Sequence, residues 1–183
     1  MMHKDIHRWI EELKRYNPLL NLVSASMVAD IEEHVENTME LLVHIQEPAI
    51  ADIGSGSGLP AIPFKIMYPK SHVVMIERAE KKCVFLRHML DVLNLEHFEL
   101  IEADPLVRKT GPFVALMSRA FSPRKTLEEI VLKTAAPSAR FHYLSTVREN
   151  PIENQAFSLI GHEEKRFRNY TLCLDSYRIT SRG

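Results

Sequence analysis

The sequence contains little cysteine and no long apolar run. Its two cysteines, Cys83 and Cys173, stand among apolar neighbours, which predicts buried free thiols and a reducing compartment. The nine histidines are scattered along the chain without a cysteine cluster beside them, so no metal site is expected. No apolar run approaches the roughly 20 residues of a membrane span, and the N-terminus lacks the apolar stretch of a signal peptide. We therefore expect a cytoplasmic protein without a membrane segment.

The sequence also lacks an excess of charge of either sign. Across 183 residues, 23 lysines and arginines stand against 24 aspartates and glutamates, a formal net charge of −1. Whole-chain charge thus gives no support for nucleic-acid binding, although a basic face can persist within a balanced total. Arg119, Arg124 and Lys125 are the main candidates for such a face, because no acid follows them until Glu128. The length favours one domain with a small appendage, and we expect a monomer.

An N-terminal helical appendage is predicted over residues 1–46. Apolar side chains recur at helical spacing from Ile6 to Leu13, which predicts a first helix that ends near Pro18 and is followed by a loop. A second apolar stripe predicts one helix from Ser26, its N-cap, to Ile45.

Residues 47–183 are predicted to form a single α/β domain, which makes one compact unit with the appendage. Short apolar strands alternate with helices, and the chain closes with two strands joined by a charged loop at 161–169. The expected strands are 48–53, 72–77, 98–101, 113–118, 141–144, 155–160 and 170–179, and the expected helices are 60–68, 79–93 and 123–134. The alternation predicts a mostly parallel, seven-stranded sheet with helices on both faces, completed by an antiparallel pair.

The glycine-rich segment after the first expected strand is the most informative part of the sequence. It reads Asp52-Ile-Gly54-Ser-Gly56-Ser-Gly58-Leu-Pro, and glycines at a strand-to-helix turn let the backbone approach a ligand closely. A dinucleotide fingerprint needs Gly-x-Gly-x-x-Gly, but the third glycine position is Leu59, and the lysine of a P-loop is absent. The spacing looks like the S-adenosylmethionine motif of Rossmann-like methyltransferases, in which an acid such as Asp52 often precedes the loop.

Two further acids follow the next two expected strands. Glu77 comes nineteen residues after Gly58, where a carboxylate can accept hydrogen bonds from both hydroxyls of a ribose. The alternative is an ordinary surface acid at the end of a strand. Asp104 is a candidate for the adenine end of the cofactor, although Asp104-Pro105 is also a common start of a turn. The predicted cofactor set is Asp52, Gly54, Gly56, Gly58, Glu77 and Asp104.

The segment after the fourth expected strand bears on the methyl acceptor. Methyltransferases of exocyclic amines carry Asn/Asp-Pro-Pro-aromatic there, whereas this chain has Ser118-Arg119-Ala120-Phe121. Methyltransferases of pyrimidine C5 need a thiolate nucleophile, and neither cysteine lies at a suitable junction. An acceptor that needs little activation remains, and the lone pair of guanine N7 is one such acceptor.

Several segments together resemble the glucose-inhibited division protein B family, the 16S ribosomal RNA guanine-N7 methyltransferases. They spread over residues 9–145. The matching pieces are Tyr16-Asn17, Asn21-Leu22, His34, the segment Asp52–Pro60, Ile62-Pro63, Lys81, Phe85-Leu86 and Ser118–Phe121. The resemblance implies an enzyme with the Rossmann-like methyltransferase fold, S-adenosylmethionine as its cofactor, and ribosomal RNA or the small ribosomal subunit as its partner.

The resemblance also implies roles on the acceptor side. Arg119 is the catalytic candidate, in contact with phosphate or base, and a structural salt bridge is its alternative. Asn17, Asn21 and Arg124 are the candidates for substrate binding, and helix capping is the alternative for the asparagines. His34 more often packs in a protein interior than acts as a base, and N7 chemistry requires no base.

The chain departs from the family pattern at several positions and is short for the family. Asn37-Thr38 stands where the family has Asp-Ser, and Leu144-Ser145-Thr146 stands where it has Leu-Lys-Gly. A lysine lost near the acceptor would weaken phosphate binding. Two alternatives therefore stay open: a divergent relative that binds S-adenosylmethionine with another acceptor or no activity, and a small-molecule methyltransferase.

Overall fold

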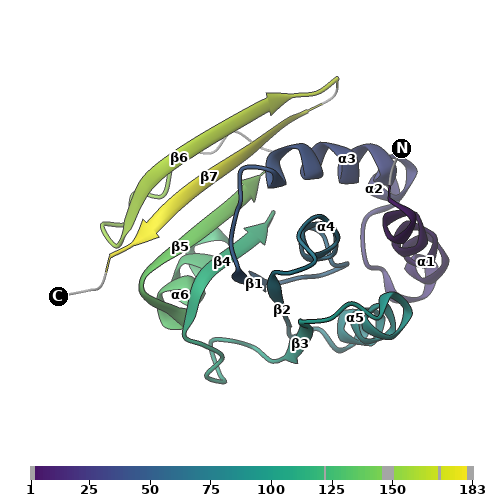
Figure 1. Cartoon of the computed structure of the whole chain (residues 1–183), viewed down its shortest axis with the longest axis horizontal. Helices are drawn as coiled ribbons and strands as arrows, with labels where there is room; N and C mark the ends of the chain where they lie inside the picture. The colour runs from purple at the N-terminus through teal and green to yellow at the C-terminus, as the bar shows by residue number, and fades with distance from the viewer. Residues whose placement is uncertain (1–2, 122, 146–150, 169, 181–183) are drawn as a thin grey trace.

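A computed structural model of the chain describes residues 3–121, 123–145, 151–168 and 170–180. Its centre is a seven-stranded sheet in the order β3-β2-β1-β4-β5-β7-β6 (Figure 1). The strands are β1 (Ala49–Ile53), β2 (His72–Glu77), β3 (Phe98–Glu102), β4 (Phe113–Arg119), β5 (Ala135–Ser145), β6 (Phe157–Arg166) and β7 (Thr171–Ile179). The first five strands run parallel and β7 runs antiparallel to both of its neighbours, so the predicted α/β class and mostly parallel sheet are confirmed.

Helices cover both faces of the sheet, but unequally (Figure 1). The helices are α1 (Lys4–Leu20), α2 (Ala25–Ala29), α3 (Ile31–Leu42), α4 (Ala61–Met67), α5 (Glu80–Leu93) and α6 (Arg124–Thr134). One apolar cluster joins α1, α3, α4 and α5 to one face, and a second joins α6 to the other. The N-terminal helices therefore pack into the same core as the helices between the strands. The boundary at residue 46 stays a prediction.

The strand order creates a crevice at the carboxyl ends of β1 and β4. The chain moves outward from β1 to β3 and then returns to the other side of β1 to form β4. The loops that leave β1 and β4 thus diverge, and open α/β sheets bind ligands at such a reversal. Side chains on both faces of β1 and β2 are buried, because helices cover each side of the sheet.

The helical N-terminus differs from the sequence prediction in two ways. Helix α1 continues through Pro18 to Leu20, because a proline this close to the end removes only one hydrogen bond. The last turn closes when the Asn21 N–H donates to the Asn17 main-chain oxygen, 2.8 Å away. The single helix predicted from residue 26 to 45 is two helices, and Ser24 rather than Ser26 caps the first by accepting from the Met27 N–H.

The C-terminal half also corrects the prediction. Strand β5 begins at Ala135 instead of 141 and contains an irregularity, because the pairing with β4 shifts register and Ser138 has φ +61°. Strand β6 continues to Arg166 through most of the predicted charged loop. As an edge strand it accepts charged side chains on an exposed surface, so it shows no apolar alternation. Asn169, at the end of that predicted loop, lies outside the described residues.

Candidate cofactor site

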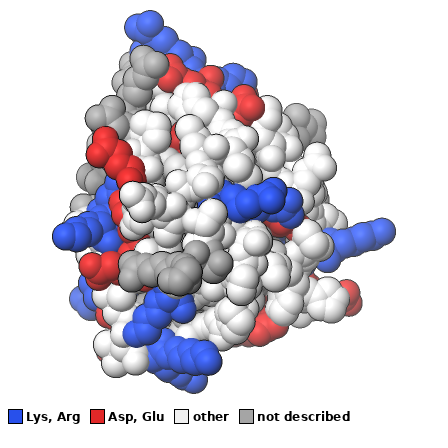
Figure 2. Space-filling view, turned by 90° about the vertical axis from the view of Figure 1, so that its left-hand side faces the viewer, with Lys and Arg blue, Asp and Glu red and all other residues white. Residues whose placement is uncertain are grey.

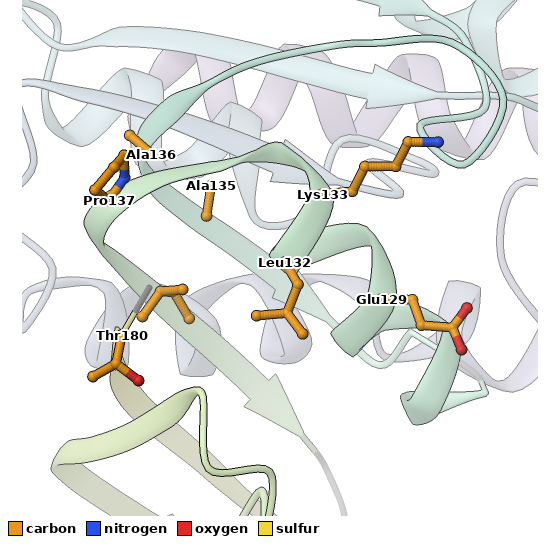
Figure 3. A pocket seen from close by; sticks show the side chains of 8 residues that line it. Glu129, Leu132, Lys133, Ala135, Ala136, Pro137 and Thr180 are labelled. Carbon is orange, nitrogen blue, oxygen red and sulfur yellow. The ribbon is translucent and has the colours of Figure 1, made fainter. Parts of the chain in front are cut away.

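A cavity of about 680 Å³ opens at the carboxyl edge of the sheet. That volume lies within the range of about 300–1,000 Å³ typical of small-molecule sites. Its walls come from the glycine loop, the ends of β2, β3 and β4, the N-terminus of α6, and the segment around Leu22 to Met27. A second hollow of about 470 Å³ lies at the opposite edge, between the end of α6, the start of β5 and the end of β7 (Figure 3). The second hollow contains none of the predicted site residues, so the candidate chemistry belongs to the first.

The glycine loop needs its glycines for backbone geometry and for space. Gly54, Gly56 and Gly58 have φ of +73°, +59° and +93°, values that other residues rarely adopt. A Cβ at Gly54 would lie 2.7 Å from the Phe121 ring, and a Cβ at Gly58 would lie 2.4 Å from the Ile62 side chain. At Gly56 the space is open apart from the Gly54 oxygen at 3.7 Å, and Gly56 lines the cavity. Of the three glycines, Gly56 is therefore the one with open space beside it for a ligand.

Glu77 ends β2 and holds the glycine loop in place. One carboxylate oxygen accepts from the Gly56 N–H at 2.9 Å, and the other accepts from the N–H groups of Arg78 and Ala79 at 2.9 and 2.8 Å. The residue is only 6% exposed and lines the cavity. A carboxylate offers about four acceptor positions, so these three bonds leave one for a ligand hydroxyl.

Asp52 lies beneath the loop rather than on the cavity wall. It is completely buried, and neither carboxyl oxygen has a hydrogen-bond partner within the described part of the chain. Burial raises the pKa of Asp52 to about 7, and the nearby Glu77 adds to the rise. The Ser55 hydroxyl donates to the Asp52 main-chain oxygen and leaves the carboxyl group unpaired among the described residues. Asp52 therefore places a titratable acid directly behind the loop.

Asp104 starts a turn and lines the cavity, and its contact with the adenine end of a cofactor stays a prediction. One oxygen accepts from the Leu106 N–H and the other from Arg78 Nη1, each at 2.9 Å, and these interactions lower its pKa. Its main-chain oxygen accepts from Val107 and Arg108, which makes the turn that the Asp-Pro pair indicated. The residue also lines the cavity, on the side away from Arg119 across the β1 loop.

Arg119 ends β4 and lines the cavity on the opposite side. Its Nε is buried without a hydrogen-bond partner among the described residues, and burial lowers its pKa. His34 lies close enough for Arg119 to lower its pKa, in addition to the larger effect of burial. The His34 ring stacks on Tyr170 with centroids 4.9 Å apart, and its Nδ1 is likewise buried and unpaired in the described structure. No structural salt bridge to Arg119 is found among the described residues.

The three other predicted residues lie off the cavity wall. Arg124 packs its guanidinium over the Tyr143 ring, 5.8 Å from the centroid. The Asn17 amide accepts from the Val23 N–H at 2.9 Å and donates to the Val23 oxygen at 3.1 Å. Asn21 ends α1 with φ +51°. The two asparagines thus shape the segment whose Leu22 and Val23 do line the cavity.

Two contacts at the site were not predicted from the sequence. The Trp9 indole N–H donates to the Ser57 main-chain oxygen at 3.0 Å, and Phe121 packs on Gly54. The apolar stripe of the first helix indicated only that Trp9 is buried. A buried indole needs an acceptor for its N–H, and this requirement was the one indication in the sequence that Trp9 makes a polar contact.

The sequence was compared with families of known proteins. The family described as rRNA small subunit methyltransferase G, GidB, matches residues 2–170. The chain belongs to this family. Similar GidB relatives named ribosomal RNA small subunit methyltransferase G include one from Geobacter metallireducens, 35% identical, and one from Polynucleobacter asymbioticus, 34% identical. These matches cover 69% and 64% of this chain but 60% and 58% of the relatives, so the chain spans about three fifths of the length of the curated relatives it matches.

Solved structures support the same fold. A putative O-methyltransferase from Klebsiella pneumoniae aligns with a TM-score of 0.66 at 13% identity, over 99% of this chain and 92% of that one. The Pyrococcus horikoshii protein TYW2 in complex with MeSAdo aligns with a TM-score of 0.60 at 18% identity, over 79% and 62%. The Rossmann-like methyltransferase fold of this GidB member is therefore confirmed.

Among the described residues, no cluster of histidine, cysteine, aspartate and glutamate has the arrangement of a metal site. None of the helices in the described ranges combines the length and apolar character needed to cross a bilayer.

Proposed function

We propose that this GidB member binds S-adenosylmethionine in the cavity at the glycine loop and methylates N7 of a guanine in 16S ribosomal RNA. The observation that carries the proposal is made at Gly56, where a side chain would meet open space. Gly56 lines the cavity together with Glu77 and Arg119. Membership of the family supports the reaction, and the names of the relatives support the RNA. Bound S-adenosylmethionine would supply an electrophilic methyl group on a sulfonium.

The residues present fit this cofactor. The main chain at Gly54 and Gly56, which line the cavity, would hold its amino-acid part, and the remaining acceptor position of Glu77 suits a ribose hydroxyl. Gly58 does not line the cavity and closes the turn of the loop through its N–H bond to the Ser55 oxygen. Asp104, which lines the same cavity, is the candidate contact for the adenine end. The sulfonium and the ammonium of the cofactor carry positive charge, and the unpaired carboxyl of Asp52 offers a compensating charge behind the loop. A neutral or anionic ligand would gain nothing from that acid.

The acceptor side supports an N7 nucleophile. The N7 lone pair attacks directly, so no residue has to remove a proton, and the main task of the protein is to align the two reactants. Arg119 can recognise guanine O6 or a phosphate, but a donor placed on N7 itself would occupy the attacking lone pair. We infer that Arg119 binds O6 or phosphate and orients the base.

The support for an RNA partner comes from membership of the family more than from the charge of this chain. The face beside β6 shows lysines and arginines scattered among acids and uncharged side chains, without a continuous basic surface (Figure 2). Ser145, at the end of β5, stands where the family resemblance expects a lysine; Thr146 of the same motif lies outside the described residues. These observations favour, as the second candidate, a GidB relative that binds S-adenosylmethionine but methylates another acceptor or none. The monomeric state and the cytoplasmic location stay predictions.

A calorimetric titration followed by a methyl-transfer assay tests the proposal. Wild-type protein should bind S-adenosylmethionine and S-adenosylhomocysteine, and Gly56→Asp should abolish binding because its carboxylate would occupy the open position. Circular dichroism and Tm of the variant control for folding, and Glu77→Gln provides a second, weaker variant. Transfer of labelled methyl to small ribosomal subunits, but not to subunits already methylated at N7, would support the RNA substrate. Absence of cofactor binding by folded wild-type protein would refute the proposal.

A further inference from the structure

Hydrogen bonds to several elements fix the glycine loop to its surroundings. The N–H groups of Gly54 and Ser55 donate to the Ile76 oxygen at 2.9 and 3.2 Å, and the Gly56 N–H donates to Glu77. Both of these anchors come from β2. A further anchor is the Ser57 oxygen, which accepts from the Trp9 indole at 3.0 Å. The Gly58 oxygen also accepts from the Ile62 N–H of α4, the helix that directly follows the loop, at 2.7 Å. Among the hydrogen bonds of the described loop, the bond from Trp9 is the one that comes from the N-terminal helices.

The peptide between Ser57 and Gly58 is the part of the loop that depends on this anchor. Gly58 has φ +93°, and a glycine restricts the orientation of the preceding peptide only weakly. The Gly58 N–H donates to the Ser55 oxygen at 2.7 Å, which closes the turn from within the loop. The carbonyl at the other end of the same peptide unit points to Trp9. These two bonds engage both the N–H and the carbonyl of the Ser57–Gly58 peptide. Ser57 lines the cavity, but its carbonyl is directed to Trp9 instead.

Trp9 is buried on a helix that packs against α5. Its side chain is completely buried, and α1 packs on α5 through Tyr16, whose ring lies 6.1 Å from Phe85 and 4.9 Å from His88. His88 Nε2 also lies 2.6 Å from Glu12 of α1. The helix that carries the indole is therefore held by contacts with α5 that do not involve the loop, which helps Trp9 to impose a conformation on its partner.

We propose that Trp9 is a positioning residue that holds the glycine loop in its ligand-binding conformation through the Ser57 carbonyl. The proposal rests on the proposed function for the identity of the ligand, S-adenosylmethionine, but not for the ordering of the loop. Trp9 is not among the residues that line the cavity. Loss of its N–H should leave the fold intact, disorder the loop and weaken cofactor binding, since the ligand must then order the loop on binding.

The experiment removes the donor and keeps the shape of the side chain. Trp9 is the single tryptophan of the chain, so growth on β-(3-benzothienyl)alanine replaces this one N–H with sulfur. Growth on 4-fluorotryptophan gives the matched control, which keeps the donor. Leu13→Val, on the same buried stripe of α1, controls for a general loss of stability. Amide hydrogen exchange over residues 54–59 and the Kd for S-adenosylmethionine are measured on each protein.

We expect the amides of the benzothienyl protein to exchange about ten-fold faster. We also expect it to bind S-adenosylmethionine about ten-fold more weakly, because one buried hydrogen bond is lost. Its kcat at saturating cofactor should stay unchanged, and the fluorotryptophan protein should behave as wild type. Exchange at the wild-type rate in the benzothienyl protein would overturn the inference, as would an equal increase in Leu13→Val. Should wild-type protein bind no S-adenosylmethionine, the proposed function fails, and the exchange measurement still decides the role of Trp9.

Discussion

Two acids near the ends of neighbouring parallel strands have contrasting surroundings. Glu77 accepts three main-chain N–H groups, whereas the equally buried Asp52 accepts none within the described structure. Hydrogen bonds stabilise a carboxylate and burial alone destabilises it, which explains why the pKa of Asp52 rises to about 7. The site thus keeps an acid whose charge changes near neutral pH directly behind the ligand loop.

Asp52→Asn should alter how stability depends on pH. Between the ordinary value of 3.8 and about 7, the folded protein holds a proton on Asp52 that the unfolded chain releases, so wild-type protein loses stability as pH rises through this window. Asparagine removes that loss. We expect the variant to have a higher Tm than wild type at pH 8, and the difference to shrink steadily towards pH 4. A difference in Tm that does not vary with pH would contradict the assignment.

Arg119→Gln should separate acceptor recognition from cofactor binding. Arg119 lies across the cavity from Asp104, so its loss should leave the Kd for S-adenosylhomocysteine within about two-fold. Methyl transfer should fall by about ten- to a hundred-fold, the range for one lost charge-assisted hydrogen bond. Lys125→Gln is the matched control, because Lys125 is exposed near the same loop and does not line the cavity. Equal losses in both variants would indicate a general electrostatic effect instead.

At the scale of the elements, the sheet was predictable because buried strands have a strong apolar signature. The bounds of β2, from His72 to Glu77, match the prediction, and the glycine loop lies where its pattern placed it. The break between α2 and α3 was missed because Val28, Ile31 and Val35 continue one apolar stripe across Asp30. The bond from Trp9 to Ser57 joins residues 48 apart, and local patterns carry no information about such a pairing.

The two asparagines at the end of α1 should respond oppositely to substitution. Asn17→Ala removes both hydrogen bonds to the Val23 main chain, and we expect a loss of about 1–3 kcal/mol in the free energy of unfolding. Asn21 has φ +51° and acts through its backbone, so Asn21→Gly should be neutral or stabilising by up to about 1 kcal/mol. Urea denaturation measures both. A large loss for Asn21→Gly would show that its side chain has a role that the described contacts do not include.

At the scale of the whole molecule, the cavity joins the N-terminal helices to the sheet. Its wall includes Leu22 and Met27 from one part and Gly56, Glu77 and Arg119 from the other. The same two parts share an apolar cluster, which predicts a single cooperative unfolding transition. A ligand that contacts both parts should therefore stabilise the chain as one unit.

S-adenosylhomocysteine at a hundred times its Kd should stabilise the protein by about 2.7 kcal/mol. For a chain of this length we expect Tm to rise by about 5–10 °C in one transition, measured by calorimetry. NAD is the control ligand and should give no shift, because Leu59 replaces the third glycine of a dinucleotide loop. Two separate transitions, with only the later one shifted by ligand, would show instead that the N-terminal helices fold independently.

The position of the single tryptophan has an optical consequence. Indole emission responds to the dipoles and hydrogen-bond acceptors around the ring, and here the only indole donates to the loop that would hold the ligand. Intrinsic fluorescence of the unmodified protein should therefore change in intensity or wavelength when that loop moves, although the ring lies outside the cavity. Stopped-flow fluorescence would then follow loop ordering in real time and without a label, and would show whether the loop orders before the ligand arrives or after.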